Sequence, residues 1–109
     1  MNGAIIGFGN IAQAHLLAYK SVSELQIKAI VDTSETRFKY ARQLHPDIKC
    51  YFSIEEMFKE QKIDFIDICT PPSTHFFYIK AGLLEKCHVL CEKPFFDGHR
   101  KLLRNFITN

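Results

Sequence analysis

The sequence predicts an α/β fold with a doubly wound parallel sheet, in which helices cover both faces and give three α/β/α layers. Three observations predict it. Strand and helix patterns alternate along the chain, a glycine-containing turn joins the first strand to the first helix, and no repeat, linker or low-complexity segment interrupts the order. Alternation of this kind produces parallel strands joined by right-handed crossovers. Because 109 residues suffice for one core, we expect one domain over residues 1–109.

The first elements follow from short apolar runs and helical periodicity. Residues 4–6 (Ala-Ile-Ile) form a run typical of a short buried strand. Apolar side chains then recur at helical spacing over residues 11–19, and residues 26–31 predict a second strand. A second helix is predicted over residues 36–44, which Pro46 stops because proline cannot continue a helix.

The middle of the chain repeats this order. Residues 49–52 predict a short strand, and Ser53 with Glu56 forms a capping box that begins a helix. The apolar side of that helix holds Ile54, Met57 and Phe58. Residues 63–69 predict the next strand, which ends at Pro71 and Pro72 because proline cannot donate to a sheet ladder.

The last third of the chain predicts two more helices around one strand. Ser73 or Thr74 caps a helix whose apolar stripe is expected to hold Phe77, Ala81 and Leu84. Residues 88–91 predict a strand. A final helix is expected from near Asp97, carrying Leu102, Leu103, Phe106 and Ile107. No strand is predicted after it, so we expect a sheet that is incomplete at the C-terminus.

Composition excludes several classes of function. The apolar fraction of 47% and the charged fraction of 24% are ordinary for a globular protein. A net charge of +2 with scattered basic residues gives no argument for nucleic acid. No apolar stretch approaches the roughly 20 residues that cross a bilayer, and the N-terminus lacks the basic segment of a signal peptide. We therefore expect a cytoplasmic protein with no nucleic-acid or membrane partner.

The four cysteines are expected to be buried free thiols. Cys87, His88 and Cys91 suggest a zinc site at first sight. On a strand, however, Cys87 and Cys91 would lie roughly 13 Å apart, which is too far for one tetrahedral ion. The other two cysteines are Cys50 and Cys69, and no metal is predicted.

The glycine turn at residues 7–12 has the pattern G-x-G-x-x-A, and Asp32 follows the second strand. Gly7 permits a tight turn, Gly9 leaves room for phosphates, and Ala12 lets the helix pack close to the strand. The helix N-terminus then offers N–H groups to an anion, and a carboxylate at position 32 can accept hydrogen bonds from a ribose. This pattern predicts a dinucleotide site. The alternative is a purely structural turn, which would not need the acid at position 32.

Three segments together resemble the N-terminal domain of the Gfo/Idh/MocA oxidoreductases, the family of glucose–fructose oxidoreductase and inositol dehydrogenase. They are residues 7–12 (Gly-Phe-Gly-Asn-Ile-Ala), 69–75 (Cys-Thr-Pro-Pro-Ser-Thr-His) and 91–94 (Cys-Glu-Lys-Pro). Their order and spacing also match, over nearly the whole chain. The resemblance implies a Rossmann-type domain of an enzyme that uses NAD or NADP to oxidise or reduce sugars, inositols and related polyols.

The resemblance assigns the cofactor's adenosine half to the start of the chain. The pyrophosphate would bind at the turn formed by Gly7, Phe8, Gly9, Asn10 and Ile11. Asp32 would hold the adenosine ribose, which favours NAD because a carboxylate repels a 2′-phosphate. Arg37, one turn into the following helix, could soften that preference and leave NADP possible. Its alternative role is that of a solvated helix residue.

The resemblance assigns the nicotinamide half to the two later segments of the chain. Thr70, Pro71, Pro72 and His75 would line it, although a histidine so early in a helix can also simply face solvent. Glu92 and Lys93 would approach the nicotinamide ribose and the substrate. Lys93 is the implied catalytic residue, because an ammonium stabilises developing negative charge on the substrate oxygen and a neutral amine can take its proton. The alternative is a surface lysine after a strand.

Family members usually carry a second domain that forms the substrate pocket and mediates oligomerisation, and we expect this chain to lack it. Three functions therefore remain open. The chain can be the NAD-binding domain of a sugar or polyol oxidoreductase that forms a homo-oligomer. It can be a non-catalytic dinucleotide-binding module, or a subunit that needs a partner. It can also be an inactive domain that self-associates through an unpaired sheet edge.

Overall fold

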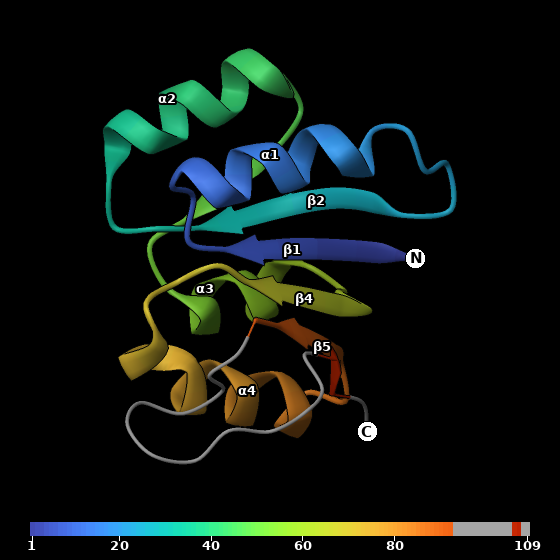
Figure 1. Ribbon diagram of the computed structural model, residues 1–109, viewed down its shortest axis with the longest axis vertical. Helices are drawn as coiled ribbons and strands as arrows, with labels where there is room; N and C mark the ends of the chain where they lie inside the picture. The colour runs from blue at the N-terminus through green and yellow to red at the C-terminus, as the bar shows by residue number, and fades with distance from the viewer. Residues whose placement is uncertain (93–105, 108–109) are drawn as a thin grey trace.

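A computed structural model describes residues 1–92 and 106–107 of the chain, and Figure 1 shows their arrangement. The strands are β1 (Asn2–Ile6), β2 (Gln26–Val31), β3 (Lys49–Tyr51), β4 (Phe65–Ile68), β5 (His88–Cys91) and β6 (Phe106–Ile107). The helices are α1 (Asn10–Tyr19), α2 (Glu35–Leu44), α3 (Ile54–Glu60), the 3₁₀ helix η1 (Pro72–Thr74) and α4 (His75–Leu84). The predicted alternation of strands and helices is confirmed, with boundaries that differ by up to two residues.

The strands form one sheet in the order β3-β2-β1-β4-β5-β6. Pairings among β1 to β5 are all parallel. The chain winds outward from β1 to β3 and then returns to place β4 on the other side of β1. This reversal is the topological switch point of a doubly wound sheet, beside which such folds bind ligands. The predicted fold class is confirmed.

The end of the chain corrects one prediction. Phe106 and Ile107 were predicted to lie in a helix, but they form β6, which runs antiparallel to β5. Ile107 pairs with Val89, and Phe106 pairs with Leu90. The backbone N–H and C=O groups on the outer edge of β5 need hydrogen-bond partners, and β6 supplies them. The spacing of apolar residues does not indicate this pairing, so it predicted a helix instead. The rest of the predicted helix lies outside the described residues.

The two faces of the sheet bury separate apolar clusters, because successive strand residues point to opposite sides. Ile5, in the centre of β1, joins the residues that pack under α1 and α2, among them Ala12, Leu16, Phe38 and Ala41. Its neighbours Ala4 and Ile6 join those under α3 and α4, among them Ile54, Met57 and Ile79. Figure 1 shows the two helix pairs in these separate layers. Within the described part of the chain, no helix has the length and apolarity needed to cross a membrane.

Helix α4 presents a different face to the sheet from the one predicted. Phe77 and Leu84 were expected on the buried stripe, but they are 57% and 71% exposed. The buried residues are His75, Ile79 and Gly82. Apolar side chains surround this helix almost completely, so periodicity does not single out one face. The orientation of α4 is set instead by Gly82, which lets the helix approach Ile66 and Val89 of the sheet closely.

Replacing Gly82 by alanine should lower the free energy of unfolding by about 1–3 kcal/mol. An added Cβ would lie 2.7 Å from Cδ1 of Ile66 and 2.9 Å from Cγ2 of Val89, and both residues are fully buried. Urea denaturation followed by circular dichroism measures the change. Helix propensity alone predicts the opposite sign, a gain of up to about 1 kcal/mol. A stabilised variant would therefore contradict this close packing, and Lys80→Ala, on the exposed face of the same helix, is the control.

Candidate functional site

The turn after β1 has a conformation that favours glycine. Gly7 has a φ of +86°, and its N–H donates to the carbonyl of Val31 at 2.7 Å. A Cβ at this position would lie 2.7 Å from Cγ2 of Thr70 and 3.1 Å from the carbonyl oxygen of Cys69. The turn therefore lies directly against the loop that follows β4. This contact brings the first two of the sequence segments, 7–12 and 69–75, together.

The N-terminus of α1 carries no side-chain cap. Gly9 occupies the N-cap position, and the first turn contains no acidic residue. By contrast, Ser34 caps α2, and Ser53 caps α3 as predicted, each accepting a hydrogen bond from a backbone N–H three residues later. Unpaired N–H groups give a helix N-terminus a partial positive charge. The start of α1 is thus suited to an anion, whereas the starts of α2 and α3 are occupied.

Asp32 lies beside this turn with its carboxylate directed at it. Oδ2 accepts a hydrogen bond from the backbone N–H of Phe8 at 2.7 Å, and Oδ1 accepts from the N–H groups of Thr33 and Ser34 at 2.6 and 3.0 Å. The side chain is only 4% exposed. These bonds offset the cost of burying the charge and fix the carboxylate at the end of β2.

Arg37 covers the same carboxylate. Its Nη1 lies 3.2 Å from Oδ2 of Asp32, although the Arg37 side chain is 52% exposed. Its Nη2 is also the nearest atom, at 4.0 Å, to a Cβ built on Gly9. Arg37 therefore lies over both the acid and the glycine turn, rather than extending into solvent. Because the guanidinium is half exposed, solvent screens its attraction to the carboxylate, so Arg37 can move away at modest cost.

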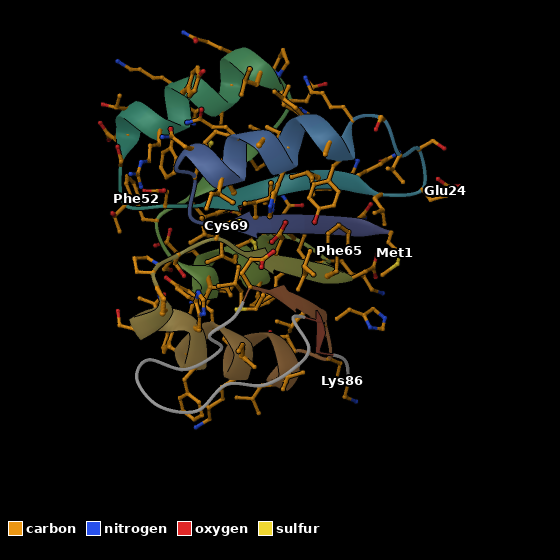
Figure 2. The ribbon with its side chains drawn as sticks, viewed as in Figure 1. Met1, Glu24, Phe52, Phe65, Cys69 and Lys86 are labelled. Atoms are coloured by element: carbon orange, nitrogen blue, oxygen red, sulfur yellow. The ribbon has the colours of Figure 1, made fainter. Side chains whose placement is uncertain are left out.

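These groups line a cavity of about 530 Å³ at the carboxyl ends of the parallel strands. Figure 2 shows Phe52 and Cys69 at this end of the molecule, and Met1, Glu24 and Lys86 at the opposite end. The predicted site residues that line the cavity are Gly7, Phe8, Gly9, Ile11, Asp32, Arg37, Thr70, Pro71 and Pro72. The volume falls within the range of about 300–1,000 Å³ that is usual for small-molecule sites.

Three of the predicted site residues that the structure describes do not line the cavity. Asn10 is exposed at the start of α1, and Glu92 is exposed just after β5. His75 is buried beneath the loop, where its Nε2 donates to the carbonyl of Thr70 at 2.8 Å. The histidine therefore holds the 70–72 segment in place from behind. Lys93 lies outside the described residues.

Two aromatic residues of the cavity were not predicted as site residues. Phe52 follows β3 and packs against Phe38, with 5.1 Å between ring centroids. Tyr78 reaches the cavity from α4. Burial raises the pKa of its phenol, and the carboxylates of Glu55 and Asp32 raise it further, so the phenol stays neutral. The sequence held no signal for Tyr78, because its position depends on the orientation that Gly82 gives to α4.

A larger, more open hollow of about 980 Å³ lies at the opposite end of the sheet, between Met1 and Lys86. The residues at the ends of α3 and α4 line it, including Gln61 and Glu85. Helix C-termini carry partial negative charge and disfavour phosphate. We therefore assign the candidate site to the smaller cavity.

A doubly wound sheet with a glycine turn, an uncapped helix and an acid after the second strand defines a Rossmann-type dinucleotide-binding domain. The sequence profile of the Gfo/Idh/MocA family, an oxidoreductase family with an NAD-binding Rossmann fold, matches residues 1–104. The chain belongs to this family.

Similar sequences and solved structures agree with this assignment. The chain is 32% identical over 90 residues to the oxidoreductase YrbE of Bacillus subtilis, covering 83% of this chain and 26% of that protein. It is 29% identical over 94 residues to myo-inositol 2-dehydrogenase of Thermotoga maritima, covering 86% of this chain and 28% of that protein. An Agrobacterium radiobacter oxidoreductase, solved with NAD⁺, L-tartaric acid and magnesium, superposes with a TM-score of 0.82 at 29% identity, covering 89% and 28% of the two chains. The chain thus spans little more than a quarter of these relatives.

Proposed function

We propose that the chain binds NAD as the nucleotide-binding part of an oxidoreductase that transfers hydride between nicotinamide and a sugar, inositol or related polyol. One observation carries the proposal. The Asp32 carboxylate and the uncapped N-terminus of α1 face a single cavity and are joined by the bond from the Phe8 N–H to Oδ2. A structural turn alone does not require a buried carboxylate beside an uncapped helix.

The residues present fit the adenosine half of NAD. Backbone N–H groups at the start of α1 would hold the pyrophosphate, and Gly9 leaves open space there, since only Arg37 comes within 4.0 Å of an added Cβ. Both Asp32 oxygens already accept hydrogen bonds, and Oδ2 accepts two, including one from Arg37. A ribose hydroxyl would therefore replace Arg37 at Oδ2. The carboxylate would disfavour a 2′-phosphate, with Arg37 offsetting part of that repulsion.

The chemistry would take place beyond the 70–72 segment. When bound, NAD supplies the acceptor or donor of a hydride. Thr70, Pro71 and Pro72 would shape the nicotinamide end of the cavity, and His75 would hold them there. By family resemblance, Lys93 would accept the proton of the substrate hydroxyl on oxidation and return it on reduction. The myo-inositol dehydrogenase of Thermotoga maritima supports a polyol as the substrate class.

Titration of the purified chain with NADH, followed by nucleotide fluorescence, tests the proposal. We expect saturable binding, with NADPH weaker by about tenfold or more because of the Asp32 charge. Gly9→Ala should weaken NADH binding by about tenfold or more, since a methyl group would occupy the space next to the helix N–H groups. The substitution has room in the folded chain, so its effect on binding can be separated from unfolding.

Ser23→Ala, in the exposed loop after α1 at the opposite end of the sheet, is the matched control and should bind NADH like the wild type. Thermal melts of all three proteins establish that they are folded. Absence of saturable NADH binding by the folded wild type would overturn the proposal. Equal affinities for wild type and Gly9→Ala would show that NADH binds elsewhere.

A further inference from the structure

A second polar cluster lies beneath α1, apart from the bonds that hold Asp32. Nδ1 of His15 lies 2.7 Å from Oδ2 of Asp67, and Sγ of Cys69 lies 3.5 Å from both Nδ1 of His15 and Oδ1 of Asp67. The Tyr19 hydroxyl donates to Oδ2 of Asp67 at 2.8 Å. The sequence assigned no partner to His15, because Asp67 lies 52 residues away and meets it only through the packing of α1 on β4.

Asp67 is an unusual residue for its position. It lies in β4, between β1 and β5, in a strand whose four residues are all buried, and it is only 1% exposed. Strands at such positions ordinarily carry Val, Ile or Leu, since burying a carboxylate is costly. Asp67 and Cys69 are two residues apart, so both side chains lie on the face covered by α1. A carboxylate, a thiol and an imidazole are thus gathered at one point under a helix.

We propose that His15, Asp67 and Cys69 form a binding site for a zinc-class divalent ion, a function distinct from the binding of the dinucleotide. The three donor atoms all lie within 4.8 Å of one another. Imidazole nitrogen, carboxylate oxygen and thiolate sulfur are the ligands that Zn²⁺ takes in proteins. Among the described residues, no other group of His, Cys, Asp and Glu side chains meets this condition.

The two sulfur distances fit tetrahedral coordination, and the His15–Asp67 distance requires a small shift. Zinc bonds near 2.3 Å to sulfur and near 2.0–2.1 Å to nitrogen and oxygen place sulfur about 3.5 Å from each lighter ligand. Both sulfur distances in the cluster are 3.5 Å. Nitrogen and oxygen ligands should be about 3.3 Å apart, whereas Nδ1 of His15 is hydrogen-bonded at 2.7 Å to Oδ2 of Asp67, and the sulfur distance is to the other oxygen, Oδ1. Binding would therefore require His15 and the carboxylate to shift. The His15 side chain is 29% exposed, so it has room to move by the remaining half ångström or so.

The charges also balance. Burial, and then the neighbouring Asp67 carboxylate, raise the pKa of the Cys69 thiol, which is therefore protonated at neutral pH. On binding, the thiol would lose its proton to solvent, and the imidazole would bind the ion through Nδ1 and carry its proton on Nε2. A dication with one thiolate and one carboxylate gives a neutral buried site. The Tyr19 hydroxyl would orient the carboxylate, as hydrogen-bonding groups around zinc ligands commonly do.

Cobalt(II), a spectroscopic substitute for zinc, tests the site in the purified, reduced chain. We expect one equivalent of Co²⁺ to produce thiolate-to-cobalt charge-transfer absorption and the visible bands of tetrahedral cobalt, both removed by Zn²⁺. Cys69→Ser should abolish the charge-transfer band and lower the affinity at least tenfold. Tyr19→Phe should weaken binding about tenfold while retaining the band. Cys50→Ser, at a partly buried thiol on β3, is the matched control and should behave like the wild type.

A folded wild-type chain without thiolate-to-cobalt absorption would overturn the proposal and leave the cluster as a hydrogen-bonded network. A band that survives Cys69→Ser and disappears in Cys50→Ser would overturn it too, because the ion would then bind elsewhere. Circular dichroism melts show whether each variant is folded. The cobalt spectrum does not depend on NADH, so this site and the dinucleotide site succeed or fail separately.

Discussion

Replacing Gly7 by alanine is expected to lower the free energy of unfolding by about 2–5 kcal/mol. Two costs add in this variant. A side chain at a φ of +86° is strained by about 1–2 kcal/mol, and the new Cβ meets Thr70 at 2.7 Å and the Cys69 carbonyl oxygen at 3.1 Å, a clash that costs about 1–3 kcal/mol. The Cys69 carbonyl belongs to the backbone, so it cannot rotate away from the new Cβ as the end of a flexible side chain could. Urea denaturation followed by circular dichroism measures the loss.

Gly9→Ala is the matched comparison for this prediction. Gly9 has an ordinary extended conformation, with a φ of −83°, and an added Cβ meets only Arg37 at 4.0 Å. Its expected cost is at most about 1 kcal/mol, because alanine is a poorer N-cap residue than glycine. The two glycines of the turn therefore have different roles, one in folding and one in ligand access. Equal stability of the two variants would contradict this division.

Replacing Asp32 by alanine should both destabilise the chain and remove NADH binding. The buried Phe8 N–H and the N–H groups of Thr33 and Ser34 would lose their acceptor, at a cost of about 2–3 kcal/mol. Loss of charge-assisted bonds to a ribose should weaken NADH binding by about ten- to a hundredfold. Thermal melts and NADH fluorescence titrations measure the two effects.

Asp32→Asn separates these effects. It keeps one oxygen, which can accept from the N–H groups of Thr33 and Ser34, but its NH2 group cannot accept from the Phe8 N–H, so only part of the stability should remain. The substitution also removes the charge that repels a 2′-phosphate. We expect the preference for NADH over NADPH to shrink or disappear in this variant. Unchanged NADH affinity in a folded Asp32→Ala variant would show that the carboxylate serves the turn and not a ribose.

Local sequence signals predicted much of this fold. Ser53 was recognised as a helix cap from its own neighbourhood, and the glycine turn from three small residues between a strand and a helix. The alternation of elements then fixed the parallel sheet, because few topologies accommodate it. Asp32 was placed at the end of β2, and its carboxylate lies against the turn as the pattern suggests.

The remaining features depend on contacts between distant segments. The buried face of α4 depends on Gly82 meeting β4 and β5, and the pairing of Phe106 and Ile107 depends on the free edge of β5. The partner of His15 depends on how α1 lies across β4. Neither helical periodicity nor residue type reports such contacts. The predictions that failed are those in which an apolar pattern was compatible with more than one partner.

The position of β6 limits where a strand from a second molecule could add to the sheet. Pairing with Val89 and Leu90 occupies the outer side of β5, leaving β6 itself, only two residues long, as one margin of the described sheet. The other margin is β3, which has three residues. Short margins offer few backbone groups to a strand from a second molecule. Within the part of the chain that the structure describes, strand addition by a second molecule, the first step toward a fibre, therefore finds little template.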